Sequence, residues 1–292
     1  MSNNLANFGD SVHWGQGLNT ADKFAHRVAD RLGLELRMEA HSGARIGIDE
    51  GCEGSTDGEV PFACPTTLQQ IRNYSGDPAS AGLILINGGI NDVTVQAIIS
   101  PLTTVDALKR RVRRYCRRSM AGLLVETLRR FPNSAVPIIV TSYFPIFSPA
   151  SDFTKIAQYL RGHLILVPHE VEFAVQRELI LNRVVENAQV FWRESSTQLQ
   201  LAIGDAGSTR IRFAEVPFED ENAMFASEPW LFEVHLKGFQ LVPEDPLARQ
   251  RHIACDAFHS NPLDRATCYI ASAGHPNLIG SEKYTEAILN LV

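Results

Sequence analysis

Two short polar segments at opposite ends of this 292-residue chain contain the side chains of nucleophilic catalysis. The segment Phe8–Ser11 offers a serine hydroxyl, and the segment Ser272–His275 offers an imidazole. A serine hydroxyl becomes a nucleophile near neutral pH when a histidine takes its proton. The residue types therefore predict acyl-transfer chemistry with Ser11 as nucleophile and His275 as general base, provided that the fold brings the two ends of the chain together.

Two further segments contain groups that could stabilise the negative charge formed in such a reaction. Gly43 in His41-Ser42-Gly43 has no Cβ, so its N–H can approach a substrate oxygen closely. Asn91 offers a neutral side-chain amide. With the N–H of Ser11, these donors predict an oxyanion hole, in which each donor typically lowers the barrier by about 2.7–4 kcal/mol. Asp10 and Asp92 are expected to support the site, Asp10 by bracing the Ser11 turn and Asp92 as a structural partner or helix cap.

Short apolar runs alternate with longer helical patterns along the chain, which predicts a parallel sheet covered by helices. Strands are expected near 5–9, 34–40, 83–86, 136–143 and 210–216, and helices near 21–32, 67–74, 108–131, 182–203 and 281–291. The polar segments around residues 11, 43 and 91 follow the first three strands. Because ligands bind outside the carboxyl ends of parallel strands, we expect these segments to meet at one edge of the sheet.

The chain shows no internal repeat and no linker, so one domain over residues 1–292 is expected. Residues 148–181 mix Pro, His and aromatic residues and fit the alternating pattern least well, which indicates a helical cap or lid insertion. Residues 47–65 are expected to form a surface loop. His252 and His259 are expected in an exposed polar loop.

The four blocks resemble those of the SGNH (GDSL-like) hydrolases, in that family's order and approximate spacing. They are Gly9-Asp10-Ser11, Gly43, Gly89-x-Asn91-Asp92 and His275-Pro276-Asn277, and the resemblance spans nearly the whole chain. It implies a three-layer α/β/α, flavodoxin-like sandwich of about five parallel strands. It also implies a cofactor-independent ester hydrolase that works through an acyl-enzyme, without a metal. The family includes esterases, lipases and carbohydrate deacetylases, so the resemblance indicates the reaction type better than the substrate.

One position departs from the family pattern, because Ser272 stands where the family has an Asp three residues before the histidine. Three explanations remain open. A backbone carbonyl of residues 270–273 could hold the His275 ring, which predicts a Ser11–His275 dyad. A carboxylate from elsewhere, with Asp256, Asp264 and Glu282 nearest in sequence, could fold in. Alternatively, the site has lost its activity.

Two other functions use the same residues. A non-catalytic module that binds carbohydrate or lipid would keep the pocket without turnover, and Ser272 is the feature that favours it. An acyltransferase would differ from a hydrolase in the access of water to the acyl-enzyme. The expected partner is a small-molecule, lipid or carbohydrate ester, and the sequence does not indicate the oligomeric state.

Composition excludes several other classes of function. The formal charge of −6 gives no electrostatic reason to expect nucleic acid as a partner. No apolar run is long enough to cross a membrane, and no leader segment is recognisable, which predicts a cytoplasmic protein unless a leader was removed. The basic cluster at residues 109–118 is expected to be a solvated helix face. Either cysteine pair, Cys52 with Cys64 or Cys255 with Cys268, could form a disulfide, and the sequence leaves this open.

Overall fold

The computed structural model describes residues 4–48, 51–162, 174–238 and 240–292. Five parallel strands form the central sheet in the order β2-β1-β3-β4-β5. They are β1 (Asn4–Phe8), β2 (Glu35–Met38), β3 (Ala81–Ile86), β4 (Ile138–Thr141) and β5 (Ile211–Ala214). The predicted parallel sheet is confirmed. The strands β2, β4 and β5 are shorter than predicted, β1 is shifted by one residue, and β3 begins two residues earlier than predicted.

Burial along the strands explains their order in the sheet. Leu83–Ile86 of β3 is fully buried, because a central parallel strand is covered by helices on both faces. Glu35–Met38 of β2 alternates between exposed and half-buried side chains, as expected of an edge strand. Glu35 and Arg37 form an exposed ion pair there, and such charges discourage pairing with another chain.

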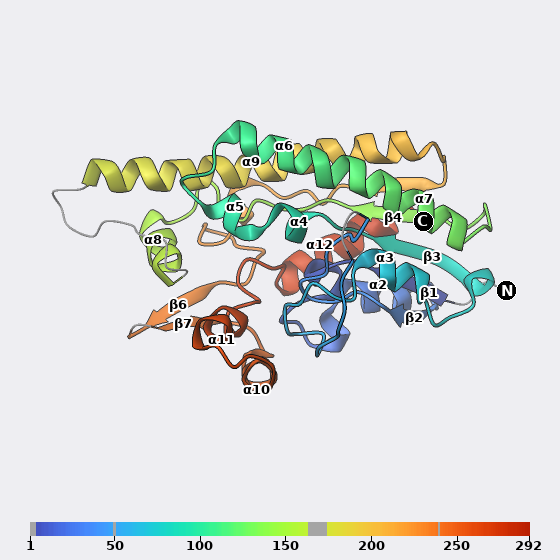
Figure 1. Cartoon of the computed structure of the whole chain (residues 1–292), viewed down its shortest axis with the longest axis horizontal. Helices are drawn as coiled ribbons and strands as arrows, with labels where there is room; N and C mark the ends of the chain where they lie inside the picture. Colours follow the sequence, from blue (N-terminus) through green and yellow to red (C-terminus); the bar gives the residue numbers. More distant parts are fainter. Residues whose placement is uncertain (1–3, 49–50, 163–173, 239) are drawn as a thin grey trace.

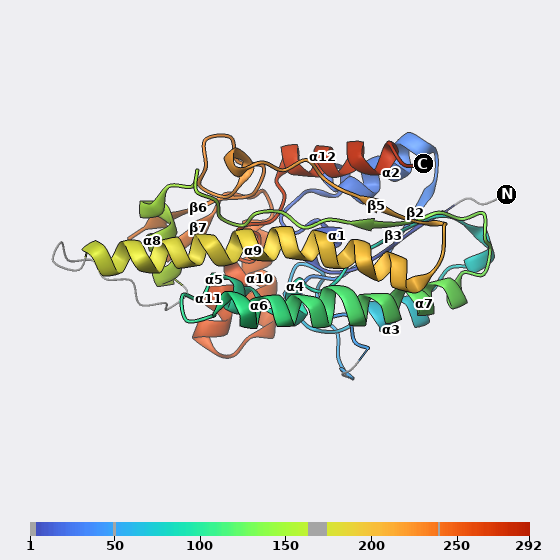
Figure 2. The same ribbon diagram turned by 90° about the horizontal axis from the view of Figure 1, so that it is seen from above.

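Helices cover the sheet on both faces (Figure 1). One layer contains α6 (Val105–Val112), the π-helical turn η3 (Arg113–Ser119), α7 (Met120–Arg130) and the 33-residue α9 (Ala174–Ala206), which pack side by side (Figure 2). The opposite layer contains α2 (Phe24–Leu32) and α12 (Leu278–Leu289). The three-layer α/β/α architecture expected from the sequence is thereby confirmed.

Several other helical segments have six residues or fewer. They are α1 (Ser11–Trp14), η1 (Thr20–Asp22), α3 (Thr67–Arg72), η2 (Pro78–Ser80), α4 (Ile90–Val93), α5 (Val95–Ile99) and η5 (Asp220–Asn222). Two of them, α1 and α4, begin within four residues of the ends of β1 and β3, which places the segments around Ser11 and Asn91 at one edge of the sheet.

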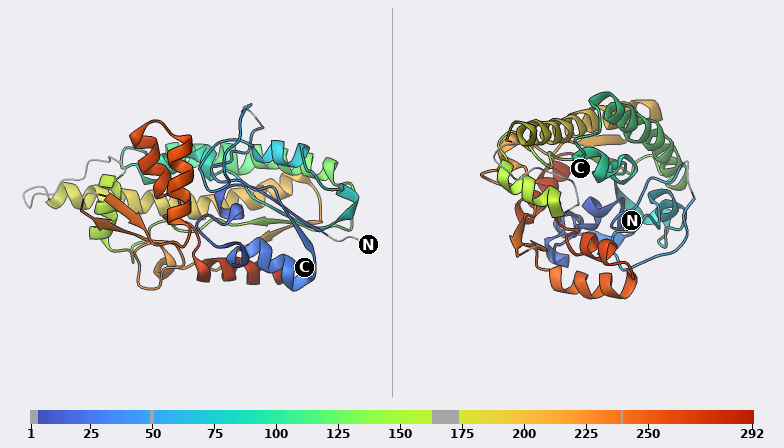
Figure 3. Two further views of the ribbon diagram at one scale, coloured as in Figure 1. Left: turned by 90° about the horizontal axis from the view of Figure 1, so that it is seen from below. Right: turned by 60° about the vertical axis from the view of Figure 1, so that its left-hand side comes forward.

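A group of elements gathers at one end of the molecule (Figures 1 and 3). It comprises α8 (Phe153–Gly162), the antiparallel hairpin β6 (Val234–Lys237) with β7 (Gln240–Pro243), α10 (Ala248–Phe258) and α11 (Pro262–Tyr269). Part of the predicted cap over 148–181 falls on α8 and the start of α9, and residues 163–173 of it lie outside the described residues. The cap therefore stays a prediction.

The expectation of an exposed loop around His252 and His259 is wrong. His252 lies on α10 with its ring against Tyr269, at a centroid distance of 4.1 Å, and His259 ends that helix. The buried residues of α10 are Arg251 and Cys255. A helix whose buried face contains an arginine shows no apolar stripe, so hydrophobic periodicity could not reveal it.

Two disulfides are present, and the free cysteine among the described residues is the buried Cys116. Cys52–Cys64 closes the loop before α3, and Cys255–Cys268 joins α10 to α11. Among the described helices, none combines the length and apolar character needed to cross a bilayer. Most of the basic cluster on α6 and η3 is exposed, which confirms a solvated helix face.

Candidate active site

Ser11 and His275 meet at the carboxyl end of β1. Ser11 is the first residue of α1, and the distance between its Oγ and the Nε2 of His275 is 2.7 Å. His275 lies in the turn before α12, where Gly274 has a φ of +73° and the His275 N–H donates to the carbonyl of Ser272 at 2.9 Å. The structure thus places two residues that are 264 positions apart within hydrogen-bond distance.

Asp10 braces the turn that presents Ser11. Its carboxylate is fully buried, accepts the N–H of Val12 at 2.9 Å and accepts the hydroxyl of Tyr143 at 2.7 Å. Its own N–H donates to the side-chain oxygen of Asn87 at 3.3 Å. Burial raises the pKa of Asp10 to about 6, against the opposing effect of these hydrogen bonds. Asp10 is therefore placed to cap α1 and fix the direction of Ser11.

Asn91 and Asp92 hold the loop that contains Gly43. The Asn91 amide donates to the carbonyl of Ala44 at 3.0 Å, and the Asp92 carboxylate accepts the N–H of Ile46 at 3.1 Å. Burial raises the pKa of Asp92 to about 7. Since the Asn91 amide has two N–H groups, one remains for a substrate oxygen. Residues at the start of α4 thus fix the loop that offers the second proposed oxyanion donor.

Position 43 requires a glycine, because of its backbone conformation and because neighbouring atoms leave no room for a Cβ. Its φ is +80°, a region that residues with a Cβ rarely adopt. A Cβ at this position would lie 2.4 Å from the backbone nitrogen of Phe62. The backbone of Pro61 and Phe62 therefore packs directly on the Gly43 turn.

One pocket of about 310 Å³ contains Ser11, Gly43, Asn91 and His275 together. The side chains that line the rest of it include Arg45, Phe62, Thr94, Val95, Tyr159 and Ile270. Its walls combine apolar groups with a few polar ones, which is typical of small-molecule sites. Thr94 has a φ of +73°, and backbone strain of this kind gathers at functional sites. Sequence analysis missed Thr94, because a threonine after a helix gives no local signal for a left-handed conformation.

The Nδ1 atom of His275 faces away from Ser11 in the hydrogen-bonding scheme, since Nε2 is the atom that contacts the Ser11 hydroxyl. This Nδ1 atom is buried and, within the described part of the chain, makes no hydrogen bond. The carbonyl groups of Ala273 and Ser272 lie close enough to raise the pKa of the ring, but neither meets hydrogen-bond geometry. The backbone carbonyls predicted to hold the His275 ring therefore lie near it but do not form a hydrogen bond with it.

The three carboxylates nearest in sequence lie elsewhere. Asp256 accepts the hydroxyl of Tyr269, Asp264 is exposed on α11, and Glu282 pairs with arginines of α2. The carboxylate that does reach this region is Asp245, which accepts the hydroxyl of Ser272 at 2.5 Å. Sequence reasoning did not name Asp245, since nothing in its local sequence distinguishes it from other loop acids.

The pKa of His275 is lowered to about 4, mainly by burial and also by the positive charge of Arg251, against the opposing effects of the Ala273 and Ser272 backbone and of Asp245. A histidine with a lowered pKa is neutral at physiological pH, which is the form that accepts a proton from serine. Among the described residues, no group of three or more His, Cys, Asp or Glu side chains is arranged to hold a metal ion.

Replacing Asn91 by alanine is expected to lower kcat on an ester substrate by about 10²–10³-fold with a smaller effect on KM, because its second N–H would act on the transition state. Steady-state kinetics would measure this. The matched control is Asn187→Ala, which removes a buried amide that donates to the carbonyls of Ser100 and Thr103. That control should lower the melting temperature and leave kcat unchanged. Equal kcat in Asn91→Ala and in the unmodified chain would exclude Asn91 from the oxyanion hole.

Comparison with known proteins adds a fold relationship to this geometry. No family model matches the chain, and no curated protein sequence matches it. Among solved structures, a phospholipase A1 from Streptomyces albidoflavus NA297 superimposes with a TM-score of 0.56 and 12% identity, over 100% of both chains. The chain shares the fold of this phospholipase A1.

Two carbohydrate esterases of family two give lower TM-scores. The enzyme from Corynascus thermopiles (Myceliophthora fergusii) gives a TM-score of 0.42 with 14% identity, over 75% of this chain and 58% of that one. The enzyme from Clostridium thermocellum gives 0.34 with 15% identity, over 75% and 55%. At 12% identity the comparison with the phospholipase A1 establishes the fold alone, and substrate and activity have to be argued from the site.

Proposed function

We propose that this chain is a serine ester hydrolase that works through an acyl-enzyme on Ser11, with His275 as general base. The observation on which the proposal depends is the 2.7 Å distance between Ser11 Oγ and His275 Nε2, in a pocket that Gly43 and Asn91 also line. A nucleophile, a base and two kinds of oxyanion donor around one pocket form the arrangement that acyl transfer requires. The fold shared with a phospholipase A1 supports the same reaction class.

The reaction would proceed in two halves. The Ser11 oxygen attacks the carbonyl carbon of the ester while its proton passes to Nε2 of His275. The negative charge on the former carbonyl oxygen faces the N–H groups of Ser11 and Gly43 and the amide of Asn91. Collapse of this intermediate expels the alcohol, which takes the proton from His275. A water then loses a proton to the same nitrogen and attacks the carbonyl carbon of the acyl-enzyme. Collapse of this second intermediate breaks the bond to the Ser11 oxygen, which takes the proton back from His275 as the acid leaves.

The substrate class follows from the walls of the pocket. Phe62, Val95 and Ile270 offer apolar surface beside the Ser11 hydroxyl, and apolar surface favours an acyl chain over a charged group. We propose a lipid or carbohydrate ester as the substrate. The phospholipase A1 found among solved structures supports the lipid ester in this range.

The proposal is tested by labelling and by turnover together. The folded protein is treated with a fluorophosphonate, and mass spectrometry of the digest locates the adduct. A panel of aryl esters of increasing acyl length is then assayed with and without an added alcohol. An adduct on Ser11 with release of free acid supports a hydrolase, whereas acylated alcohol as the main product indicates an acyltransferase. Ligand binding without labelling or turnover would support the non-catalytic module instead.

The two disulfides also bear on the compartment. Disulfides persist in oxidising compartments and are rare in the cytosol, so we propose that the protein works in an oxidising one, which corresponds to the leader-removed alternative. Thiol titration of the unfolded, unreduced protein should then find one thiol per chain, from Cys116. Five thiols in protein isolated from its native source would contradict this proposal and favour the cytoplasm.

A further inference from the structure

Behind the catalytic pair lies a group of buried charged side chains, which we call the buried charge cluster (Lys23, Glu59, Asp245 and Arg251). The side chains of Arg251 and Asp245 are fully buried, and that of Glu59 is 4% exposed. Lys23 lies 3.9 Å from Glu59. Charges are rarely buried to this degree, because their desolvation is unfavourable unless each charge is paired and hydrogen-bonded. The cluster therefore requires an explanation.

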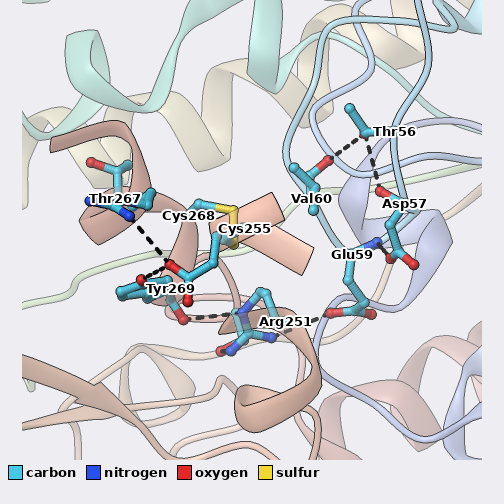
Figure 4. Close-up of a disulfide and its surroundings, with 12 residues drawn as sticks. Thr56, Asp57, Glu59, Val60, Arg251, Cys255, Thr267, Cys268 and Tyr269 are labelled. Atoms are coloured by element: carbon cyan, nitrogen blue, oxygen red, sulfur yellow. Dashed lines mark hydrogen bonds and ion pairs between the residues drawn. A yellow bond between two sulfur atoms is a disulfide. The ribbon is translucent and has the colours of Figure 1, made fainter. Parts of the chain in front are cut away.

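Arg251 uses all of its hydrogen-bonding capacity. A guanidinium has five N–H donors, and here they face five acceptor contacts. Nε donates to the carbonyl of Tyr269 at 3.1 Å, and Nη1 donates to Glu59 at 3.3 Å and to Asp245 at 3.1 Å. Nη2 donates to Asp245 at 2.5 Å and to the Ser272 hydroxyl at 3.1 Å. Figure 4 shows Arg251 between Tyr269 and Glu59, beside the disulfide that joins α10 to α11.

On one side, the cluster holds the turn that follows the nucleophile. Glu59 accepts the indole N–H of Trp14 at 2.9 Å, the amide of Gln16 at 2.9 Å and the backbone N–H of Gly17 at 3.2 Å. Because Trp14 is the last residue of α1 and the other two residues follow it directly, Glu59 fixes the position of the helix that begins at Ser11.

On the other side, the cluster holds the turn that precedes the histidine. The Ser272 hydroxyl donates to Asp245 at 2.5 Å, and the Ser272 carbonyl accepts the N–H of His275 at 2.9 Å. The two turns also touch directly, since a Cβ on Gly17 would lie 2.8 Å from that of Ser272 and 3.2 Å from that of Asp245. Arg251 thus joins the nucleophile turn to the histidine turn through Glu59 and Asp245.

We propose that Arg251 and Asp245 are positioning residues, which hold the Ser272 turn so that His275 faces Ser11. The cluster would thereby replace the carboxylate that the SGNH pattern places at position 272, with the Ser272 hydroxyl as the connection to Asp245. This inference rests on the proposed function of the Ser11–His275 pair. It explains how the imidazole is oriented although its Nδ1 makes no hydrogen bond in the described structure.

The charges of the cluster predict a specific signature. The charged groups that act on His275 are Arg251 from α10, which lowers its pKa, and Asp245 from the loop before α10, which raises it. Asp245→Asn removes the carboxylate that raises the pKa of His275 and leaves Arg251 paired with Glu59 alone, so this pKa should fall further. Arg251→Gln leaves the carboxylates, so this pKa should rise. Because neutral His275 is the active form, the acidic limb of kcat/KM should move to lower pH in the first variant and to higher pH in the second.

The experiment compares Ser272→Ala, Asp245→Asn and Arg251→Gln with the unmodified chain. Active-site concentration is measured by fluorophosphonate labelling, kcat and KM by ester turnover from pH 3.5 to 9, and the His275 titration by NMR of the histidine ring. We expect kcat per labelled site to fall about 10- to 100-fold with KM roughly unchanged, because a small misplacement of the base lowers the rate that much. The two charge variants should show pH shifts of opposite sign.

The control is Arg27→Gln, which breaks the partly buried pairs of Arg27 with Asp22 and Glu282 at 3.1 and 2.5 Å. It should lower the melting temperature without changing kcat or the pH limb. Ser272→Ala keeps Arg251 and Asp245 paired, so it decides the question if the charge variants do not fold. A fall in melting temperature alone, with unchanged kcat per labelled site in Ser272→Ala, would overturn the inference. Absence of labelling in the unmodified chain would instead refute the proposed function, and the NMR titration would still test the predicted shifts.

Discussion

Replacement of Ser11 by alanine is expected to lower kcat for ester hydrolysis by at least about 10⁴-fold, because removing the nucleophile of such a site leaves only binding and oxyanion stabilisation. The Ser11 hydroxyl lies in the pocket with its Oγ 2.7 Å from His275, so the alanine variant loses both the attacking atom and the proton that the base would receive. The measurement is single-substrate kinetics together with fluorophosphonate labelling, which should disappear completely.

The matched control for this variant is Ser195→Ala. Ser195 is a fully buried serine on α9 whose hydroxyl donates to the carbonyl of Trp192 at 3.0 Å. Its loss should affect stability and leave both turnover and labelling intact. Because α1 is short and its cap is made by Asp10, Ser11→Ala itself should fold normally, and its melting temperature reports this. Undiminished hydrolysis in Ser11→Ala would refute the acyl-enzyme proposal.

Replacement of His275 by alanine is expected to lower kcat by a similar factor, at least about 10⁴-fold, and to slow fluorophosphonate labelling of Ser11. Asp10 precedes the nucleophile in sequence, and its carboxylate already accepts hydrogen bonds from Val12 and Tyr143. No second base is therefore in place. Because His275 lines the pocket, added imidazole should enter the space that the alanine leaves and restore part of the activity.

His26→Ala is the matched control for the histidine, since His26 is half-buried on α2. It should keep its activity and should not respond to imidazole. Full activity of His275→Ala without imidazole would show that Ser11 is activated by another group. The hydrolase proposal would then need a different base.

The non-catalytic alternative depends on the serine at position 272. In the structure, the Ser272 side chain is fully buried and bonded to Asp245 and Arg251. A carboxylate is therefore still connected to the histidine turn, by way of a hydroxyl. Although Ser272 departs from the family pattern, it is bonded to the charged groups of Asp245 and Arg251. This arrangement favours a working site over one that has lost its function.

Two acids near the site, the buried Asp10 and the half-buried Asp92, illustrate how function opposes stability. Burial raises the pKa of Asp10 to about 6 and that of Asp92 to about 7, so their charged forms are unfavourable in the folded state. Asp10 nevertheless accepts the backbone N–H of Val12, next to Ser11. Asp92 accepts the backbone N–H of Ile46, in the loop that contains Gly43. Such local conflicts with burial preferences are expected where a site has to be held rigidly.

Much of the sheet was predictable because its strands are local patterns. The run Leu83–Ile86 is apolar throughout and lies in the centre of the sheet. The polar segments after β1, β2 and β3 meet at one edge because parallel strands share a direction. Ser11, Gly43, Asn91 and His275 were accordingly expected around one pocket, and the structure lines one pocket with all four.

The helices that support the histidine were not predictable in the same way. The buried face of α10 consists of Arg251 and Cys255, so its periodicity is that of a polar segment. Its burial depends on partners distant in sequence, since Glu59 is 192 residues from Arg251. Pairings of this kind become visible only when the chain is folded, because no local pattern encodes them.

The sequence by itself determined which residue types are available for the proposed reaction, since these depend on local chemistry. It also determined the order along the chain of the strands and helices that position them, since these depend on local periodicity. Only the tertiary structure decided what lies behind the imidazole. It placed Asp245 and Arg251 there, in place of Asp256, Asp264 or Glu282, because the orientation of a buried ring depends on groups that meet through packing.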